Sequence, residues 1–212
     1  PPRRELKWGE AEIRNSQEVS HAAGSLPDEP AFEADMMNLF LVVEIGDHHV
    51  TLLDGDKMEP IHRFPSRFAL HGGPKYSPDG RYVYFGSRDG WITKYDIYNL
   101  KVVAEVRAGI NMRNIAVSAD GNYVLAANYL PHSMVLFDAA NLEMLDFIPV
   151  ENDAGESSRV SAVYTAPPRS SFIAALKDIP EAWEITVENQ KAKLRRMTTD
   201  TLLDDFFFDP GY

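Results

Sequence analysis

Short apolar runs separated by turn residues fill the chain from Asn38 onward. Runs of this length, bounded by Gly, Pro, Asn, Asp and Ser, are typical of β-strands rather than of helices. One stretch predicts four successive strands, at residues 71–76, 82–87, 91–96 and 101–107. A looser copy predicts four more, at residues 160–164, 171–176, 183–187 and 194–197.

A repeat in the sequence indicates how these strands are arranged. Asp54, Asp96 and Asp138 each follow an apolar run, and they are spaced by 42 residues both times. The turn and strand start at residues 77–83 recur at 118–124, shifted by 41 residues. Repeats of roughly 40–45 residues built from four short strands are typical of propeller blades. The sequence therefore predicts an all-β fold, a partial β-propeller of at least three blades, with residues 206–208 beginning a further one.

The domain organisation follows from where the strand pattern starts. Residues 1–35 are polar and contain Pro, Gly, Ser and Asp, which predicts a linker with a short helix around residues 8–16. Residues 36–212 are predicted to be propeller blades. Three to four blades do not close a ring of about four to eight, and open inner strands would present apolar edges. We therefore expect both ends of the chain to be truncations of a larger protein.

Composition excludes several functions. A net charge of −11 argues against nucleic acid as a partner, because phosphate binding needs a basic surface. The apolar runs are strand-sized, so no transmembrane segment is predicted. There is no cysteine, which excludes disulfides, thiolate metal sites and cysteine nucleophiles. The sequence also has no glycine-rich phosphate loop, no Gly-x-Ser-x-Gly and no His-Glu-x-x-His motif.

Candidate binding residues gather at one predicted face of the ring. In a blade, the loop into the inner strand and the loop between the second and third strands lie at the same face. The first kind of loop carries His71, Arg113 exactly 42 residues later and, after a four-residue insertion, Arg159. The second kind carries residues 47–49, 88–89, 129–132 and 177–178, with basic and aromatic side chains among them. Guanidinium groups bind carboxylates in a fork, and a neutral imidazole ligates metals. The face is therefore predicted to bind a flat ligand with several carboxylates and a metal centre.

His71 is the strongest of these candidates. It precedes Gly72-Gly73-Pro74, where glycines allow a close backbone approach and the proline fixes the chain direction. Arg88 and Asp89 could equally form an ion pair within their turn. Loop histidines are usually solvated or hydrogen-bonded, and we expect the same of His48, His49 and His132.

Several of these segments resemble a known family. Residues 68–71, 77–82 and 86–90 resemble the haem d1-binding propeller of cytochrome cd1 nitrite reductases, as do residues 108–113 and 129–131. The resemblance runs from Asn38 to the C-terminus and corresponds to roughly the first half of an eight-bladed ring. Longer strings are similar to a related family, the NirN-type dihydro-haem d1 dehydrogenases: residues 8–14, 46–50, 68–76, 128–132 and 175–181.

The resemblance implies roles for individual residues. His71 is expected to be an axial ligand of the haem d1 iron, and Arg88 and Arg113 to hold carboxylates of the macrocycle. Tyr129 is expected beside the macrocycle, and Lys177 belongs to the same cofactor-binding set. The implied activity is oxidation of a propionate of dihydro-haem d1 to an acrylate, with electrons passed to a covalently held haem c. The family also implies a periplasmic location and, as partners, the tetrapyrrole substrate, an electron acceptor and proteins of haem d1 biosynthesis.

Two departures from the family pattern matter. The Cys-x-x-Cys-His motif for haem c is absent, so a cytochrome c domain is expected outside this chain, and the catalytic residues are expected in later blades. Nitrite reductases have an arginine in the first blade where this sequence has Ile45 or Gly46, which favours the dehydrogenase. The alternatives are a nitrite reductase, a haem d1 carrier without catalysis, and a propeller that only docks partners.

Overall fold

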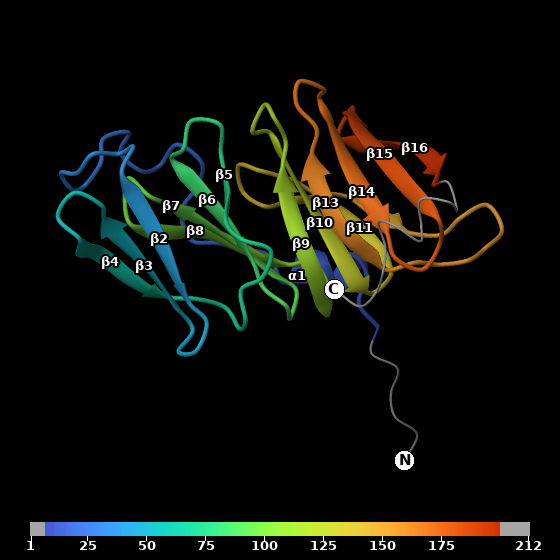
Figure 1. Ribbon diagram of the computed structural model, residues 1–212, viewed down its shortest axis with the longest axis horizontal. Helices are drawn as coiled ribbons and strands as arrows, with labels where there is room; N and C mark the ends of the chain where they lie inside the picture. Colours follow the sequence, from blue (N-terminus) through green and yellow to red (C-terminus); the bar gives the residue numbers. More distant parts are fainter. Residues whose placement is uncertain (1–6, 200–212) are drawn as a thin grey trace, which may run out of the picture.

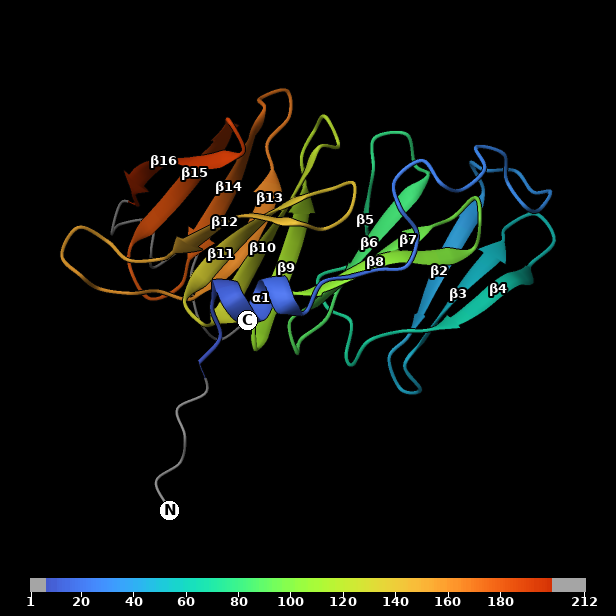
Figure 2. The ribbon, with the colours of Figure 1, turned by 180° about the vertical axis from the view of Figure 1, so that it is seen from behind.

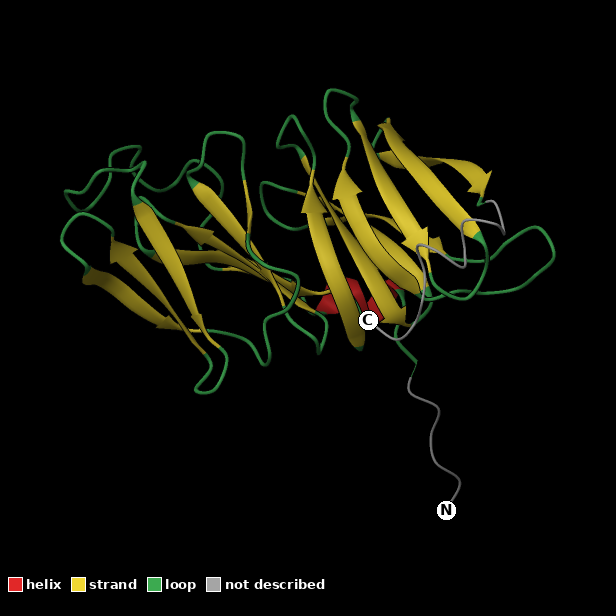
Figure 3. Ribbon diagram, in the orientation of Figure 1, coloured by secondary structure: helices red, strands yellow, loops and turns green. Residues whose placement is uncertain are grey.

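Four antiparallel sheets follow one another along the chain in the computed structural model, which describes residues 7–199 (Figure 1). Nearly all of the described regular structure is strand, with a single short helix among residues 7–199 (Figure 3). The sheets stand side by side as blades, so the predicted all-β, partial propeller is confirmed. Residues 206–208, predicted to begin a further blade, lie outside the described residues.

Each blade is a meander of antiparallel strands, with an additional strand from the N-terminal segment in blade 2. Blade 1 has three strands, β2 (Leu39–Glu44), β3 (His49–Asp54) and β4 (Glu59–Pro65). Blade 2 contains β5 (Lys75–Tyr76), β6 (Tyr82–Gly86), β7 (Trp91–Asp96) and β8 (Lys101–Arg107), with β1 (Glu18–Val19) added at its outer edge. Blade 3 contains β9 (Asn111–Val117), β10 (Tyr123–Leu130), β11 (Ser133–Asp138) and β12 (Met144–Pro149). Blade 4 contains β13 (Val160–Thr165), β14 (Ser171–Leu176), β15 (Glu181–Glu188) and β16 (Lys191–Thr198).

The 42-residue repeat has a clear structural cause. Asp54, Asp96 and Asp138 end β3, β7 and β11, the strands that precede the outer meander strand of blades 1, 2 and 3. Oδ1 of each accepts the backbone N–H two residues further on. Four residues after each aspartate the backbone has a positive φ: 56° at Met58, 56° at Leu100 and 60° at Leu142. The aspartate therefore caps the turn that leads into the outer strand, which explains why it recurs in phase with the blades.

The inner strand of blade 2 is shorter than predicted. A strand was expected over residues 71–76, but β5 comprises only Lys75–Tyr76. Gly72 and Gly73 adopt φ values of +83° and +69°, and Pro74 has no N–H for a strand ladder. His71 therefore lies on a loop, which is held to the sheet by a 2.8 Å hydrogen bond from the His71 N–H to Gly86 O.

The N-terminal segment packs against the outer side of the blades. Helix α1 (Glu10–Asn15), within the predicted range 8–16, buries Ile13 and contacts β8 and β12 (Figure 2). Arg14 Nη1 donates to Met144 O at 3.0 Å, which connects α1 to blade 3. Strand β1 then pairs with β8, so the segment joins blades 2 and 3. No helix within residues 7–199 has both the length and the apolar character needed to cross a membrane.

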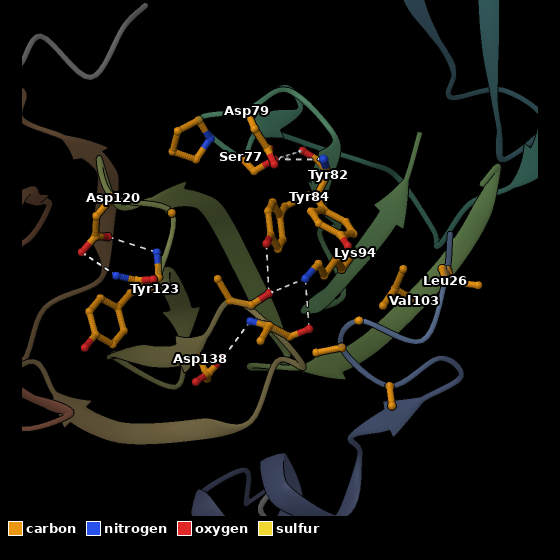
Figure 4. Close-up of a pocket in the computed structure, with 18 of the residues that line it drawn as sticks. Leu26, Ser77, Asp79, Tyr82, Tyr84, Lys94, Val103, Asp120, Tyr123 and Asp138 are labelled. Carbon is orange, nitrogen blue, oxygen red and sulfur yellow. Dashed lines mark hydrogen bonds between the residues drawn. The ribbon is translucent and has the colours of Figure 1, made fainter. Parts of the chain in front are cut away.

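A buried lysine connects blades 2 and 3 at the ends of the blades opposite His71. Lys94 Nζ donates to Ala139 O at 2.8 Å and to Ala140 O at 3.0 Å, and it lies 4.0 Å from the centre of the Tyr82 ring. These groups border a cavity of about 580 Å³ (Figure 4). Burial lowers the pKa of Lys94 to about 8, although Asp138 and Asp96 nearby favour the charged form.

This lysine should make stability depend on pH. An unfolded chain keeps the lysine pKa near 10.5, so between about pH 8 and 10.5 the unfolded state binds more protons than the folded state. The contribution of Lys94 to the free energy of unfolding should therefore rise with pH across this window. Lys94→Met should lose that rise, whereas Lys101→Met, at an exposed position, should keep it. Thermal unfolding of the three proteins at pH 7.5 and 9.5 measures the difference; parallel shifts in melting temperature would contradict it.

Candidate functional site

Three loops of blades 2 and 3 are joined into one platform by backbone hydrogen bonds. They are residues 69–74, residues 87–90 and residues 108–113. Arg88 N donates to Ala69 O at 3.0 Å, and Met112 N donates to Arg88 O at 3.1 Å. Because each loop is bonded to the next, the side chains that it carries are held in fixed relation to one another.

Two glycines allow these loops to come together so closely. A Cβ at Gly90, where φ is +97°, would come 1.8 Å from Gly109 O. A Cβ at Gly72 would lie 2.7 Å from the Cβ of Asn114. Any larger residue at either position would push the loops apart.

The surroundings of His71 fix its tautomer. Its Nδ1 lies 2.9 Å from Arg113 O, and its Nε2 lies 2.8 Å from Nη1 of Arg113. A carbonyl oxygen only accepts and a guanidinium only donates, so Nδ1 carries the proton and Nε2 presents its lone pair. A backbone carbonyl on one ring nitrogen is the arrangement that prepares the other nitrogen to ligate a metal.

Three cations surround the ring of Tyr129 at the end of β10. Arg159 Cζ lies 5.4 Å from the ring centre, Lys177 Nζ 5.6 Å and Arg113 Cζ 5.9 Å. These distances are within the range of cation–π attraction. Arg159 also pairs with Asp178 at 2.5 Å, which holds the pKa of that carboxyl at about 2. Predicted rim residues from blades 3 and 4 thus meet in one cluster.

Arg88 does not form the turn ion pair considered as its alternative role. Within residues 7–199 no ion pair joins it to Asp89, whose carboxylate accepts a hydrogen bond from Ser87 Oγ at 2.6 Å. The Arg88 residue is exposed on its loop. The carboxylate-binding role expected for Arg88 stays a prediction.

The other rim histidines are hydrogen-bonded or packed at the surface, as expected for loop histidines. His132 Nδ1 lies 2.8 Å from Ser157 Oγ, and His49 Nδ1 lies 2.8 Å from Asp47 O. His48 packs against the ring of Phe68 at 5.3 Å. None of these contacts places the three histidines together with His71.

An apolar cavity of about 310 Å³ lies beside His71. Val43, Leu70 and Phe85 line it, together with the backbone of residues 72–74. Among residues 7–199, no group of three or more His, Cys, Asp or Glu residues is arranged to hold a metal ion. The donor set is one imidazole, several cations and an apolar wall. This set fits a flat macrocycle that carries its own metal and several carboxylates.

Comparison with known proteins identifies the family. Residues 34–212 match the family described as Cytochrome D1 heme domain. The chain belongs to this family. Its propeller blades and the resemblance inferred from short sequence strings are thereby confirmed.

Individual relatives in and around the cytochrome D1 heme domain family differ in similarity. The dihydro-heme d1 dehydrogenase of Pseudomonas aeruginosa is 60% identical over all 212 residues of the chain, which span 43% of that relative. Protein NirF of Stutzerimonas stutzeri is 32% identical over 69% of the chain and 38% of the relative. The nitrite reductase of the same organism is 29% identical over 73% of the chain and 27% of the relative. The chain thus spans less than half the length of these curated relatives.

Solved structures also resemble this chain. Dihydro-heme d1 dehydrogenase NirN, solved in complex with DHE, superposes with a TM-score of 0.91 at 60% identity, over the whole chain and 46% of that structure. The hydrazine synthase of Kuenenia stuttgartiensis has a TM-score of 0.60 at 14% identity, over 82% of the chain and 52% of that structure. At this identity the second likeness concerns the fold alone.

Two residues that shape the site were not predicted from the sequence. The Asn114 amide donates to Val163 O at 3.1 Å and accepts from Val163 N at 3.0 Å, so it joins the inner strands of blades 3 and 4. Arg107 was assigned only to the end of an outer strand, yet its Nε donates to Asp89 O at 2.8 Å, on the loop of Arg88. The available signal for Asn114 was a polar residue directly before the apolar residues 115–117 of a predicted strand. The sequence contained no signal for the contact that Arg107 makes.

Proposed function

We propose that the protein is a dihydro-haem d1 dehydrogenase and that blades 1–4 supply one part of its tetrapyrrole-binding face. The observation that carries this proposal is the 60% identity to the Pseudomonas aeruginosa enzyme across the entire chain. The arrangement around His71 supports it, because a prepared imidazole lies among cations that suit a macrocycle with several carboxylates.

Each site residue has a distinct role in binding. His71 Nε2 is the axial ligand of the haem d1 iron, so the Arg113 guanidinium that now donates to it must turn toward a carboxylate of the substrate. Arg88 and Lys177 hold further carboxylates, and Tyr129 lies against the macrocycle. When bound, the macrocycle supplies the redox chemistry, while these residues ligate, orient and neutralise it.

The reaction converts a propionate side chain to an acrylate. Two hydrogen atoms leave as two protons and two electrons, and a carbon–carbon double bond forms. The electrons pass to a haem c held by a domain outside this chain. Because the chain spans 43% of the dehydrogenase relative, we expect the base that takes a proton in the rest of the protein. We propose a periplasmic location for the whole protein, with an electron acceptor and proteins of haem d1 biosynthesis as partners; the family resemblance supports this proposal.

Nitrite reduction is the second candidate, and the first blade gives it less support. Ile45 and Gly46 follow β2 at the same face as His71, and both are exposed. Neither offers the cation that nitrite reductases have there. The lower identity to nitrite reductase agrees with this difference.

A spectral assay of the complete protein separates the candidates. Dihydro-haem d1 is added without oxygen, in the presence of an oxidised electron acceptor, and the visible spectrum is followed. A dehydrogenase converts the spectrum to that of haem d1 while the acceptor is reduced. A bound but unchanged spectrum would establish the carrier instead, and nitric oxide formed from added nitrite and reductant would establish the reductase.

A further inference from the structure

Arg107 lies between the N-terminal segment and the binding face. Its position is the last residue of β8, at the end of the blade that carries the loop of residues 87–90. Trp8 and Ser16, on either side of α1, both contact it. None of the roles proposed above involves this residue.

The N-terminal segment forms hydrogen bonds with both the backbone N–H and the backbone carbonyl of Arg107. Trp8 Nε1 donates to Arg107 O at 3.2 Å, and Arg107 N donates to Ser16 Oγ at 2.9 Å. The guanidinium lies over the indole of Trp8, with Cζ 4.7 Å from the ring centre. Such stacking limits where a planar guanidinium can point. The position of the Arg107 side chain therefore depends on the positions of Trp8 and Ser16.

The guanidinium in turn holds the loop of Arg88. Arg107 Nε donates to Asp89 O at 2.8 Å, one residue beyond Arg88. The same loop is confined on its other side by the Gly90 contact with Gly109 and by the hydrogen bond from Ala108 N to Gly90 O at 2.8 Å. Together with the bonds of Arg88 N to Ala69 O and of Met112 N to Arg88 O, the contact at the Asp89 carbonyl restrains the direction in which Arg88 leaves the backbone.

We propose that Arg107 is a positioning residue: it couples the packing of the N-terminal segment against β8 to the orientation of Arg88. With Trp8 and Ser16 in place, Arg107 holds Arg88 in the direction needed to bind a carboxylate of the tetrapyrrole. When the segment is displaced, the loop loses this restraint and Arg88 binds less well. This inference rests on the proposed function, because it gives Arg88 the carboxylate-binding role.

A double-mutant cycle in the complete protein tests this coupling. Arg107→Lys keeps the charge but loses the planar group that both stacks on Trp8 and donates to Asp89 O. It should weaken binding of dihydro-haem d1 about fivefold when Arg88 is present, and not weaken it further in an Arg88→Gln protein. Trp8→Ala should show the same dependence on Arg88, which tests the N-terminal contact separately. Affinity is measured by spectral titration and stability by thermal unfolding.

Arg14→Lys is the matched control, because Arg14 bonds Met144 O from the same helix without touching the loop. It should lower the melting temperature and leave affinity unchanged, because Trp8 and Ser16 keep their contacts with Arg107. Equal losses of affinity for Arg107→Lys with and without Arg88, or no loss at all, would overturn the inference while leaving the proposed function intact. If Arg88→Gln itself binds like wild type, the carboxylate role of Arg88 fails and the inference fails with it.

Discussion

His71→Ala in the complete protein is expected to change the visible spectrum of bound haem d1 and to weaken its binding about tenfold or more. The substitution removes the nitrogen that the Arg113 carbonyl and guanidinium prepare as a ligand, and metal sites lose at least this much when a ligand or its orienting partner is removed. Spectral titration of wild type and variant measures both effects.

His132→Ala is the control for this substitution. His132 is also a rim histidine, but its Nδ1 is engaged with Ser157 rather than with the residues around His71. The spectrum and the affinity should stay close to those of wild type. Similar spectra for the two variants would contradict the assignment of His71 as the iron ligand.

Asp96→Ala is expected to lower the free energy of unfolding by about 3–5 kcal/mol, because it removes the buried partner of a largely buried cation and leaves only the exposed Asp28. The Asp96 carboxylate is fully buried and binds Arg81 at 3.0 Å. The same carboxylate accepts from Tyr98 N and from the Asn99 amide, both at 2.9 Å. Arg81 also bonds Asp28 at 2.6 Å, so the loss would loosen the N-terminal segment as well.

Asp138→Ala, at the equivalent position of blade 3, distinguishes the stability contributed by the ion pair from that contributed by the turn hydrogen bond. Asp138 accepts the N–H of Ala140 but forms no pair with an arginine within residues 7–199. Its removal should cost only about 1 kcal/mol, as expected for a turn hydrogen bond. Denaturant unfolding of both variants measures the difference. Equal costs would show that the Arg81 pair contributes little.

The blades could be predicted because short local sequence motifs specify their turns. The aspartates that end β3, β7 and β11 and the Ser-x-Asp-Gly turns act through hydrogen bonds within a few residues, and they recur in phase. In the latter turns Ser77 and Ser118 donate to Asp79 and Asp120 at 2.5 and 2.6 Å. Local chemistry of this kind is visible in a sequence without knowledge of tertiary contacts.

The site could be predicted only in part, for physical reasons. Loop positions at the repeat period placed His71, Arg113 and Tyr129 on one face, because strand polarity decides which end of a blade a loop occupies. The hydrogen bond between His71 and Arg113 joins residues 42 positions apart, and the role of Arg107 depends on Trp8, 99 positions away. Contacts over such separations arise from the packing of the blades and of the N-terminal segment, and no local sequence pattern predicts them.

If this face binds dihydro-haem d1 as proposed, a propionate of the bound tetrapyrrole should be dehydrogenated. Mass spectrometry of the tetrapyrrole extracted from the complete protein tests it most directly, after incubation with dihydro-haem d1 and an oxidised acceptor without oxygen. We expect a product lighter by two hydrogen atoms, formed by wild type and lost or strongly slowed in His71→Ala. Recovery of unchanged dihydro-haem d1 from wild type, with the acceptor still oxidised, would contradict it.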